Sequence, residues 1–169
     1  MGVADVLNAV GRAEARAALT NCCASSAWVD GMLSKRPYTD DESLIETAYD
    51  VAETISDDDW LEAFTAHPMI GDVESLRKKY AATKVTAADE QSGVAGADER
   101  TLQELAELNR EYLRRFGFIF IVFATGKNAA QMLAMLRTRI DNCRDEEIQI
   151  AAEEQMKITE LRLKKLAEA

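Results

Sequence analysis

The chain contains one histidine, His67, and its side chain is the strongest candidate for proton transfer in this sequence. An imidazole with an ordinary pKa of about 6.5 gains and loses a proton near neutral pH, as general acid–base catalysis requires. Pro68 follows it, and a residue before proline disfavours the helical region, so a helix should end near His67. Position alone leaves a second interpretation open, in which His67 is structural and bonds a carbonyl at the helix end.

Arg162 is the second candidate, because a helical wheel over the last segment places it on the apolar face. The positions on that face are Ile148, Ala151, Ala152, Gln155, Ile158, Arg162 and Leu166. A guanidinium that faces the core needs an acceptor, since an unpaired buried charge is strongly destabilising. Its planar fork suits a ligand carboxylate or ureido group. A structural ion pair, or a side chain that reaches past the core to solvent, is the alternative.

The other reactive side chains form no motif of their own. The cysteines are Cys22, Cys23 and Cys143, and adjacent cysteines have poor geometry for a disulfide. Three thiols and one imidazole at these spacings do not match a zinc site, so we expect reduced core thiols, no metal and no other cofactor. Glu90 and Gln91 occur in the aperiodic stretch 83–97, and alone they are typical of solvated loop residues.

The composition argues against several classes of partner. The formal net charge is −10 at pH 7, and a surface of that sign repels nucleic acid. The longest apolar run, 116–125, is too short to span a bilayer, and no basic patch precedes an apolar stretch near the N-terminus. We therefore expect a cytoplasmic protein with no membrane or nucleic-acid partner, in which a few local cations would attract an anionic substrate.

Helical periodicity runs through most of the chain and predicts an all-α, single-domain helical bundle over residues 1–169. Predicted helices begin at caps that are Thr39 or Asp40, then Ser56, Asp72 and Asn128. A long helix should end at Gly117, and the last should begin near Asp145. The segment 118–124 has the composition of a strand but no recognisable partner strand, so we expect a buried helix or an extended core segment.

Several strings occur in order along the chain at compatible spacing. They include His67-Pro-Met-Ile-Gly71-Asp72, Glu90-Gln91-Ser92-Gly93, Leu108 to Phe118, Arg139-Ile-Asp-Asn142, Glu147 and Arg162-Leu163, with Cys22-Cys23, Trp28 and Trp60 to Phe64 upstream. Together they resemble the OHCU decarboxylase family. The resemblance implies an all-helical, dimeric and cofactor-independent enzyme of urate degradation. Its reaction would convert 2-oxo-4-hydroxy-4-carboxy-5-ureidoimidazoline to (S)-allantoin and carbon dioxide.

The resemblance also implies the site residues. His67 would transfer the proton, and Glu90 would hold the substrate and orient His67. Substrate-binding positions would be Pro68, Ala87, Glu90, Gln91, Phe120, Ile121, Val122, Phe123, Ala124 and Arg162, with no metal ligand. Three positions depart from the family pattern, since Met69, Ala87 and Ile119 stand where Arg, Ser and Pro are usual. These departures bear on affinity and on the identity of the ureide.

Two alternatives remain at this stage. A hydrolase or isomerase acting on a related ureide would use the same His67 and Glu90 to handle water. A non-catalytic helical binding module would instead have Arg162 paired in its core. Release of carbon dioxide with formation of allantoin distinguishes the decarboxylase from both.

Overall fold

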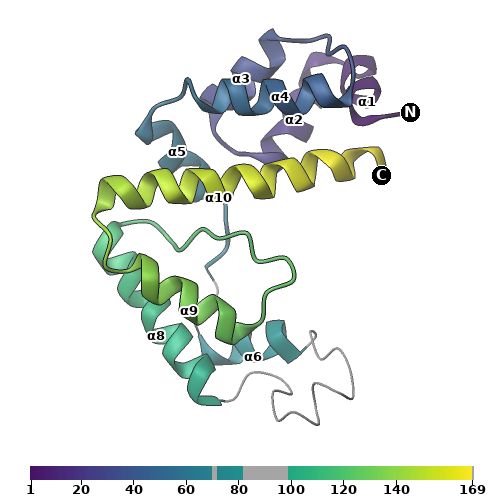
Figure 1. Ribbon diagram of the computed structural model, residues 1–169. Helices are drawn as coiled ribbons and strands as arrows, with labels where there is room; N and C mark the ends of the chain where they lie inside the picture. The colour runs from purple at the N-terminus through teal and green to yellow at the C-terminus, as the bar shows by residue number, and fades with distance from the viewer. Residues whose placement is uncertain (70–71, 82–98, 169) are drawn as a thin grey trace. The chain divides into compact units, whose positions relative to one another are not determined.

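The structure, a computed structural model, describes residues 1–69, 72–81 and 99–168. Within these ranges the regular elements are helices and no strand occurs, so the predicted all-α fold is confirmed (Figure 1). The chain divides into two compact units, which are described separately. Unit 1 comprises Met1–His67, Ile121–Phe123 and Ile148–Ala169, and unit 2 comprises Pro68–Phe120 and Ala124–Glu147. The single-domain organisation stays a prediction. None of the described helices is long and apolar enough to cross a membrane.

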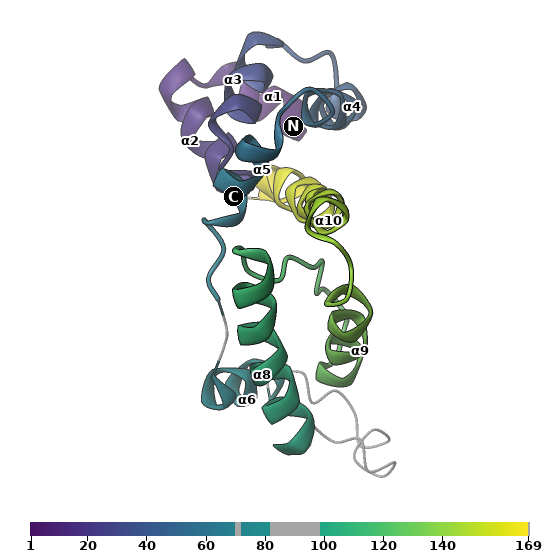
Figure 2. The ribbon, with the colours of Figure 1, turned by 90° about the vertical axis from the view of Figure 1, so that its left-hand side faces the viewer.

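Unit 1 is built around helix α3. Its elements are α1 (Val3–Ala9), α2 (Arg12–Cys22), α3 (Ser26–Ser34), α4 (Asp41–Ala52), α5 (Asp57–Phe64), most of α10 (Arg144–Lys165) and the 3-10 helix η1 (Leu166–Glu168). α3 packs against α2, α4 and α5, and α10 runs alongside these helices (Figures 1 and 2). Trp28 on α3 is fully buried, and its indole N–H donates to the carbonyl of Ala48 on α4 at 3.0 Å. The buried indole N–H of Trp28 therefore has a hydrogen-bond acceptor inside the core.

The two helices that precede the histidine, α4 and α5, begin at the predicted caps. The Asp40 carboxylate accepts the Ser43 N–H at 2.8 Å, and Ser56 forms the expected capping box with Asp59. α5 ends at Phe64, and a turn follows in which the His67 N–H donates to the Phe64 carbonyl at 3.2 Å. The predicted helix end before Pro68 is therefore confirmed, and His67 occupies a fixed backbone turn.

Unit 2 contains α6 (Val73–Ala81), α8 (Glu99–Phe116), α9 (Ala129–Arg139) and the first residues of α10. α8 and α9 lie side by side (Figure 1). Asp72 and Asn128 cap α6 and α9 as predicted, and α8 ends at Gly117, whose φ of 80° is left-handed. The predicted starts of α6 and α9 and the predicted end of α8 are confirmed.

A buried polar cluster joins the helices of unit 2. The Arg139 side chain donates to the Glu147 carboxylate, and the two side chains are 7% and 0% exposed. The Tyr112 hydroxyl also donates to Glu147, at 2.5 Å, and the Asn142 amide donates to it at 3.1 Å. Burial, the largest cause, raises the pKa of Tyr112 well above its ordinary value, so its hydroxyl stays protonated and available to donate.

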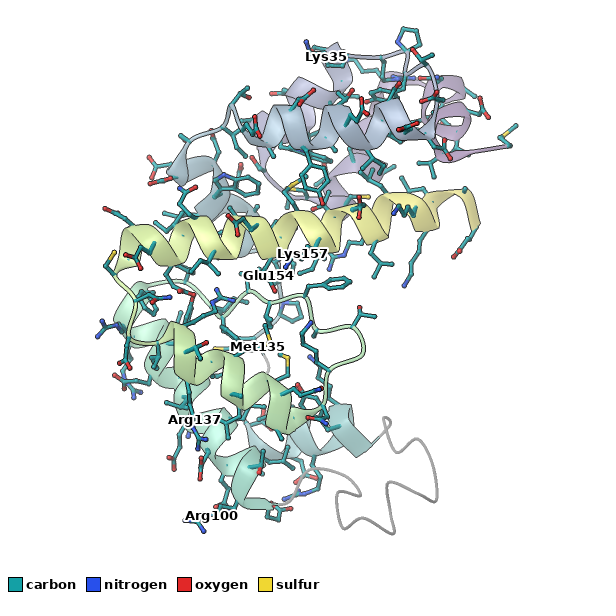
Figure 3. The ribbon with its side chains drawn as sticks, in the orientation of Figure 1. Lys35, Arg100, Met135, Arg137, Glu154 and Lys157 are labelled. Carbon is teal, nitrogen blue, oxygen red and sulfur yellow. The ribbon has the colours of Figure 1, made fainter. Side chains whose placement is uncertain are left out.

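The segment 118–124 is extended and irregular, so of the two expected conformations the extended one is confirmed. Ile121 and Val122 are buried. Within unit 1 the Phe123 N–H donates to the Glu154 carboxylate on α10 at 3.0 Å, and Lys157 pairs with the same carboxylate at 2.5 Å (Figure 3). A side chain of α10 therefore supplies the acceptor that a neighbouring strand would otherwise provide.

Candidate active site

His67 is half-buried and fixed at both its backbone and its ring. Its Nε2 lies 2.5 Å from Oε1 of Gln155 on α10. Burial is the largest influence on the ring and lowers the pKa of His67 below its ordinary value of 6.5; the Gln155 hydrogen bond raises this pKa and the Arg162 charge lowers it. The net direction is downward, so the imidazole is neutral at neutral pH and can accept a proton.

The α10 residues around His67 also form hydrogen bonds to carbonyl groups at the C-terminal end of α2. The Gln155 amide nitrogen lies 3.1 Å from the Thr159 hydroxyl, which lies 3.0 Å from the Cys22 carbonyl oxygen. One turn further along α10, Arg162 donates to the Asn21 carbonyl at 3.3 Å. Carbonyls in the last turn of a helix have no partner within the helix, and α10 side chains satisfy two of them here. This packing of α10 brings Gln155 and Arg162 close to His67.

The prediction that Arg162 faces the core is wrong, because its side chain is exposed. The buried stripe of α10 is rotated toward Thr159 and Leu163, both 0% exposed. Thr159 can be buried because its hydroxyl is hydrogen-bonded, which a hydropathy pattern does not register. Arg162 lies at the edge of this stripe, where its charge reaches His67 and the end of α2.

We expect Arg162→Leu to raise the pKa of His67, because it removes a positive charge that disfavours the imidazolium ion. An NMR titration of the ring protons measures this directly, since the chain has one histidine. Arg162 is exposed and makes a long bond to one carbonyl, so the free energy of unfolding should change by less than about 0.5 kcal/mol. Arg16→Leu, which removes an exposed arginine paired with Asp30, is the control and should leave the pKa of His67 unchanged. An unaltered titration in Arg162→Leu would show that the two charges do not interact.

The other predicted substrate-binding residues fall into three groups. In unit 1, Ile121 and Val122 are buried and Phe123 is half-buried. In unit 2, Pro68 is exposed, and Phe120 and Ala124 are half-buried. The positions outside the described residues are Ala87, Glu90 and Gln91. The binding role of every one of these residues stays a prediction, as does the catalytic role of Glu90.

Phe120 lies against the polar cluster of unit 2. Its ring centre is 5.4 Å from that of Tyr112, in an edge-on arrangement. The Arg139 guanidinium lies 4.6 Å from the centre of the same ring. This arginine therefore contacts both the Glu147 carboxylate and the face of the Phe120 ring. The second contact holds the ring in place, and the family resemblance assigns this ring to the substrate pocket.

The cysteines differ from one another in burial. Cys22 and Cys23 are buried as predicted, and burial, the largest cause, raises their pKa values to about 12 and about 11, so both remain thiols. Cys143 is exposed, and the prediction of a core position is wrong for this residue. It occupies the turn between α9 and α10, where side chains reach solvent. No group of His, Cys, Asp and Glu within the described ranges could hold a metal ion.

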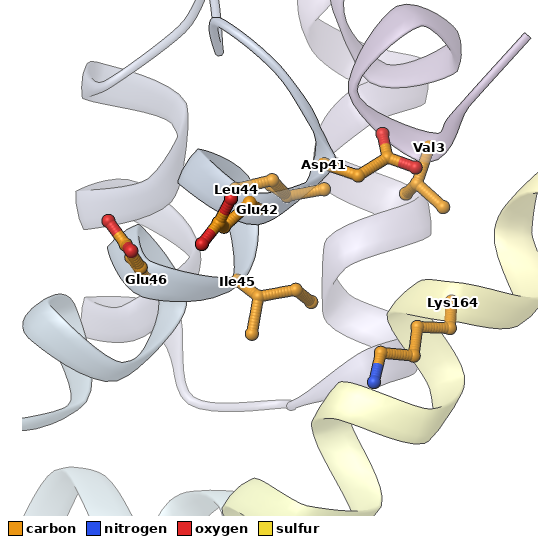
Figure 4. A pocket seen from close by; sticks show the side chains of 7 residues that line it. All are labelled: Val3, Asp41, Glu42, Leu44, Ile45, Glu46 and Lys164. Carbon is orange, nitrogen blue, oxygen red and sulfur yellow. The ribbon is translucent and has the colours of Figure 1, made fainter.

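A cavity of about 420 Å³ lies elsewhere in unit 1, between α1, α4 and α10 (Figure 4). Its lining residues are Val3, Asp41, Glu42, Leu44, Ile45, Glu46 and Lys164. Asp41 already accepts the Ala4 N–H at 2.8 Å, and Lys164 pairs with Glu160 at 3.6 Å. It contains none of the predicted site residues, so it is not the candidate active site.

Gln155 and Thr159 are the site residues that sequence reasoning missed. The helical wheel placed Gln155 on the core face, and Thr159 was not among the residues assigned to that face. A buried amide must find partners, so a glutamine on an apolar stripe is itself a signal of a buried polar contact. The identity of that contact depends on residues 88 positions away in the chain, which periodicity cannot supply.

Comparison with known proteins defines the class of protein to which this site belongs. The sequence profile of OHCU decarboxylases matches residues 8–164. A crystal structure of an OHCU decarboxylase in the presence of (S)-allantoin is 41% identical, with a TM-score of 0.69, over 89% of this chain and 96% of that one. The chain therefore belongs to the OHCU decarboxylase family.

Two relatives illustrate its range. A uric acid degradation bifunctional protein of Arabidopsis thaliana is 42% identical over 86% of this chain, which spans 45% of that protein's length. A 2-oxo-4-hydroxy-4-carboxy-5-ureidoimidazoline decarboxylase of Haloferax volcanii is 29% identical over 82% of this chain and 80% of its own length. The first relative is more than twice as long as the matched region, whereas the second is close to it in length.

Proposed function

We propose that this chain decarboxylates 2-oxo-4-hydroxy-4-carboxy-5-ureidoimidazoline to (S)-allantoin and carbon dioxide in urate degradation. Family membership supports the reaction class. The observation that carries the proposal is the environment of His67, a half-buried imidazole with lowered pKa that Gln155 holds and Arg162 flanks. Such a group can accept a proton and return it, beside a cation that attracts an anionic substrate.

The reaction can proceed through groups that the substrate itself contains. Breaking the bond to the carboxylate leaves an electron pair, which the adjacent C=N bond of the ring accepts while its nitrogen takes a solvent proton. Neutral His67 removes the hydroxyl proton, and the resulting enolate takes a proton from the imidazolium on the ring carbon that bears the ureido group. The hydroxyl carbon becomes a carbonyl, carbon dioxide leaves, and His67 returns to its neutral form. The face from which the proton arrives determines the stereochemistry of the product.

The chain's side chains would divide three tasks in this scheme. His67 moves the proton, and Arg162 binds the carboxylate or the ureido group. Glu90 and Gln91 hold the polar groups of the substrate, and Phe120 to Ala124 exclude water from the ring. Orientation and exclusion of water are as important as the proton itself, because the unassisted reaction lacks both.

Circular dichroism of the product tests the proposal. Freshly generated substrate mixed with the protein should yield carbon dioxide and the dichroic signal of (S)-allantoin alone. Racemic allantoin formed at the rate of the protein-free sample would contradict the proposal. A hydrolase or isomerase of a related ureide would consume its substrate without releasing carbon dioxide.

Arg162→Leu is expected to raise KM for the decarboxylation by about tenfold to a hundredfold. A hydrogen bond to a charged group contributes roughly 1.5–3 kcal/mol, and leucine removes this bond to the substrate. Initial rates over a range of substrate concentrations measure the change, with Arg16→Leu as the control. A parental KM would show that Arg162 serves only to bond the end of α2.

Metal removal is expected to have no effect on turnover. The sequence offers one histidine and no zinc-site spacing, and the scheme above moves the proton with an imidazole. Extensive dialysis against a chelator should leave kcat unchanged. Loss of activity that zinc or manganese restores would contradict a cofactor-independent mechanism.

We propose further that the protein acts as a homodimer in the cytoplasm. Resemblance to a dimeric family supports the first point, and the absence of a membrane-crossing helix from the described residues is compatible with the second. Light scattering with size-exclusion chromatography tests the oligomeric state.

A further inference from the structure

We propose that Gln155 and Thr159 are positioning residues that hold His67 as the Nε2–H tautomer, so that Nδ1 is the nitrogen that exchanges a proton with the substrate. The identity of that substrate rests on the proposed function, whereas the tautomer does not. A series of hydrogen bonds runs from α2 through α10 to the ring, and each member fixes the orientation of the next.

The group at the far end of this series of hydrogen bonds can only accept. It is the carbonyl of Cys22, the last residue of α2, where helix carbonyls have no partner within the helix. Thr159 Oγ1 lies 3.0 Å from this oxygen and is completely buried. A hydroxyl carries one proton, so Thr159 donates it to Cys22 and presents only lone pairs to its other neighbours.

A competing acceptor for that proton lies nearby, and it is weaker. The Cys23 thiol also interacts with Thr159, but its pKa is raised to about 11, chiefly by burial, so the sulfur is protonated at neutral pH. A neutral thiol is a poor acceptor compared with a backbone carbonyl. The bond from Thr159 to Cys22 therefore prevails.

The orientation of the Gln155 amide follows from Thr159. Only the amide NH2 can donate to the Thr159 lone pairs, across a distance of 3.1 Å. The amide oxygen then points the other way and lies 2.5 Å from Nε2 of His67. The reverse orientation would place an amide oxygen against a hydroxyl whose proton is already donated. Gln155 is 1% exposed, so water cannot compensate for such a mismatch.

The ring nitrogen that faces a carbonyl oxygen must carry a hydrogen. Nε2–H can donate to Gln155 both in the neutral imidazole and in the imidazolium ion. The proton that distinguishes these two forms is therefore gained and lost at Nδ1. In the proposed reaction, Nδ1 takes the hydroxyl proton and its N–H then delivers a proton to the ring carbon.

Nitrogen-15 NMR of the single histidine tests the tautomer without using activity. At a pH above the titration of the ring, we expect a pyrrole-like Nε2 signal and a pyridine-like Nδ1 signal in the parent protein. The reverse assignment, or an average of both tautomers, would overturn the proposal whether or not the protein decarboxylates the substrate. A correct tautomer in a protein that releases no carbon dioxide would refute the proposed function instead.

Three variants separate positioning from a structural role. Thr159→Val removes the hydroxyl that orients the amide, and Gln155→Leu removes the acceptor for Nε2–H. Both should shift the nitrogen signals toward a mixture of tautomers and lower kcat by about tenfold to a hundredfold. Losses of this size are usual when the hydrogen-bond partner that orients a metal-bound histidine is removed. Gln155→Glu keeps an acceptor against Nε2 and should retain the Nε2–H signature with a raised pKa for His67.

The matched control is Thr47→Val on α4. Its hydroxyl donates to the Ser43 carbonyl within α4, so this hydrogen bond is not part of the series that joins Cys22, Thr159, Gln155 and His67. This variant should keep the parental tautomer and kcat. Equal losses of kcat in Thr47→Val and Thr159→Val, with unchanged nitrogen signals in both, would show that Thr159 is merely structural.

Discussion

Replacement of His67 by asparagine is expected to lower turnover by about a hundredfold to ten-thousandfold, the usual contribution of general acid–base catalysis. Asparagine keeps a polar side chain of moderate size but cannot gain and lose a proton near neutral pH. The effect should appear in kcat, with little change in the affinity for a non-reacting analogue, because proton transfer occurs only during the reaction.

The stability of the same sample distinguishes catalysis from structure. His67 is half-buried after the end of α5, and its ring bonds Gln155. We therefore expect His67→Asn to lower the free energy of unfolding by about 1 kcal/mol, within the range of a single hydrogen bond. A purely structural histidine would show the opposite pattern, with marked destabilisation and normal kcat for the folded fraction.

The stereochemistry of the product provides a further check. The uncatalysed reaction delivers a proton to either face, so residual conversion by His67→Asn should yield less pure (S)-allantoin. A folded variant that releases carbon dioxide at the parental rate and forms (S)-allantoin alone would exclude His67 as the proton-transfer residue. A variant that is folded and slow but fully stereospecific would instead indicate that another group delivers the proton.

The helix boundaries could be predicted from the sequence because their causes are local. Asp40, Ser56, Asp72 and Asn128 each bond a backbone N–H three residues further along the chain. Pro68 also acts locally, because proline restricts the backbone conformation of the residue before it. The residues of a capping interaction therefore lie within a few positions of each other, and the sequence pattern does not depend on the rest of the chain.

The partners of His67 could not be predicted in this way. Its ring bonds a residue 88 positions away, and Thr159 bonds a carbonyl 137 positions away. Helical periodicity gives only the approximate face of α10; it assigned Arg162 to the core and did not single out Thr159. The exposure of Arg162 follows from hydrogen bonds that bury a hydroxyl, which depend on the tertiary fold.

The largest expected effect on stability is in unit 2, where Glu147→Gln should lower the free energy of unfolding by about 3–5 kcal/mol. Glutamine preserves the size of the side chain and can still accept from Tyr112. It removes the carboxylate that pairs with the Arg139 guanidinium, which is 7% exposed. Urea unfolding followed by helical circular dichroism measures the loss. The matched control is Glu111→Gln, whose exposed pair with Arg114 should contribute less than about 1 kcal/mol.

A double variant shows whether the loss comes from breaking the Arg139–Glu147 ion pair or from packing. Arg139→Met combined with Glu147→Leu removes both charges and fills the space with apolar side chains, so it should be more stable than Glu147→Gln alone. The sulfur of methionine can also pack against the Phe120 ring that the guanidinium covers in the parent. If the double variant is as unstable as the single one, hydrogen bonds and packing at Tyr112 account for the stability of the cluster. If Glu147→Gln costs no more than Glu111→Gln, the Arg139–Glu147 pair is not buried in solution.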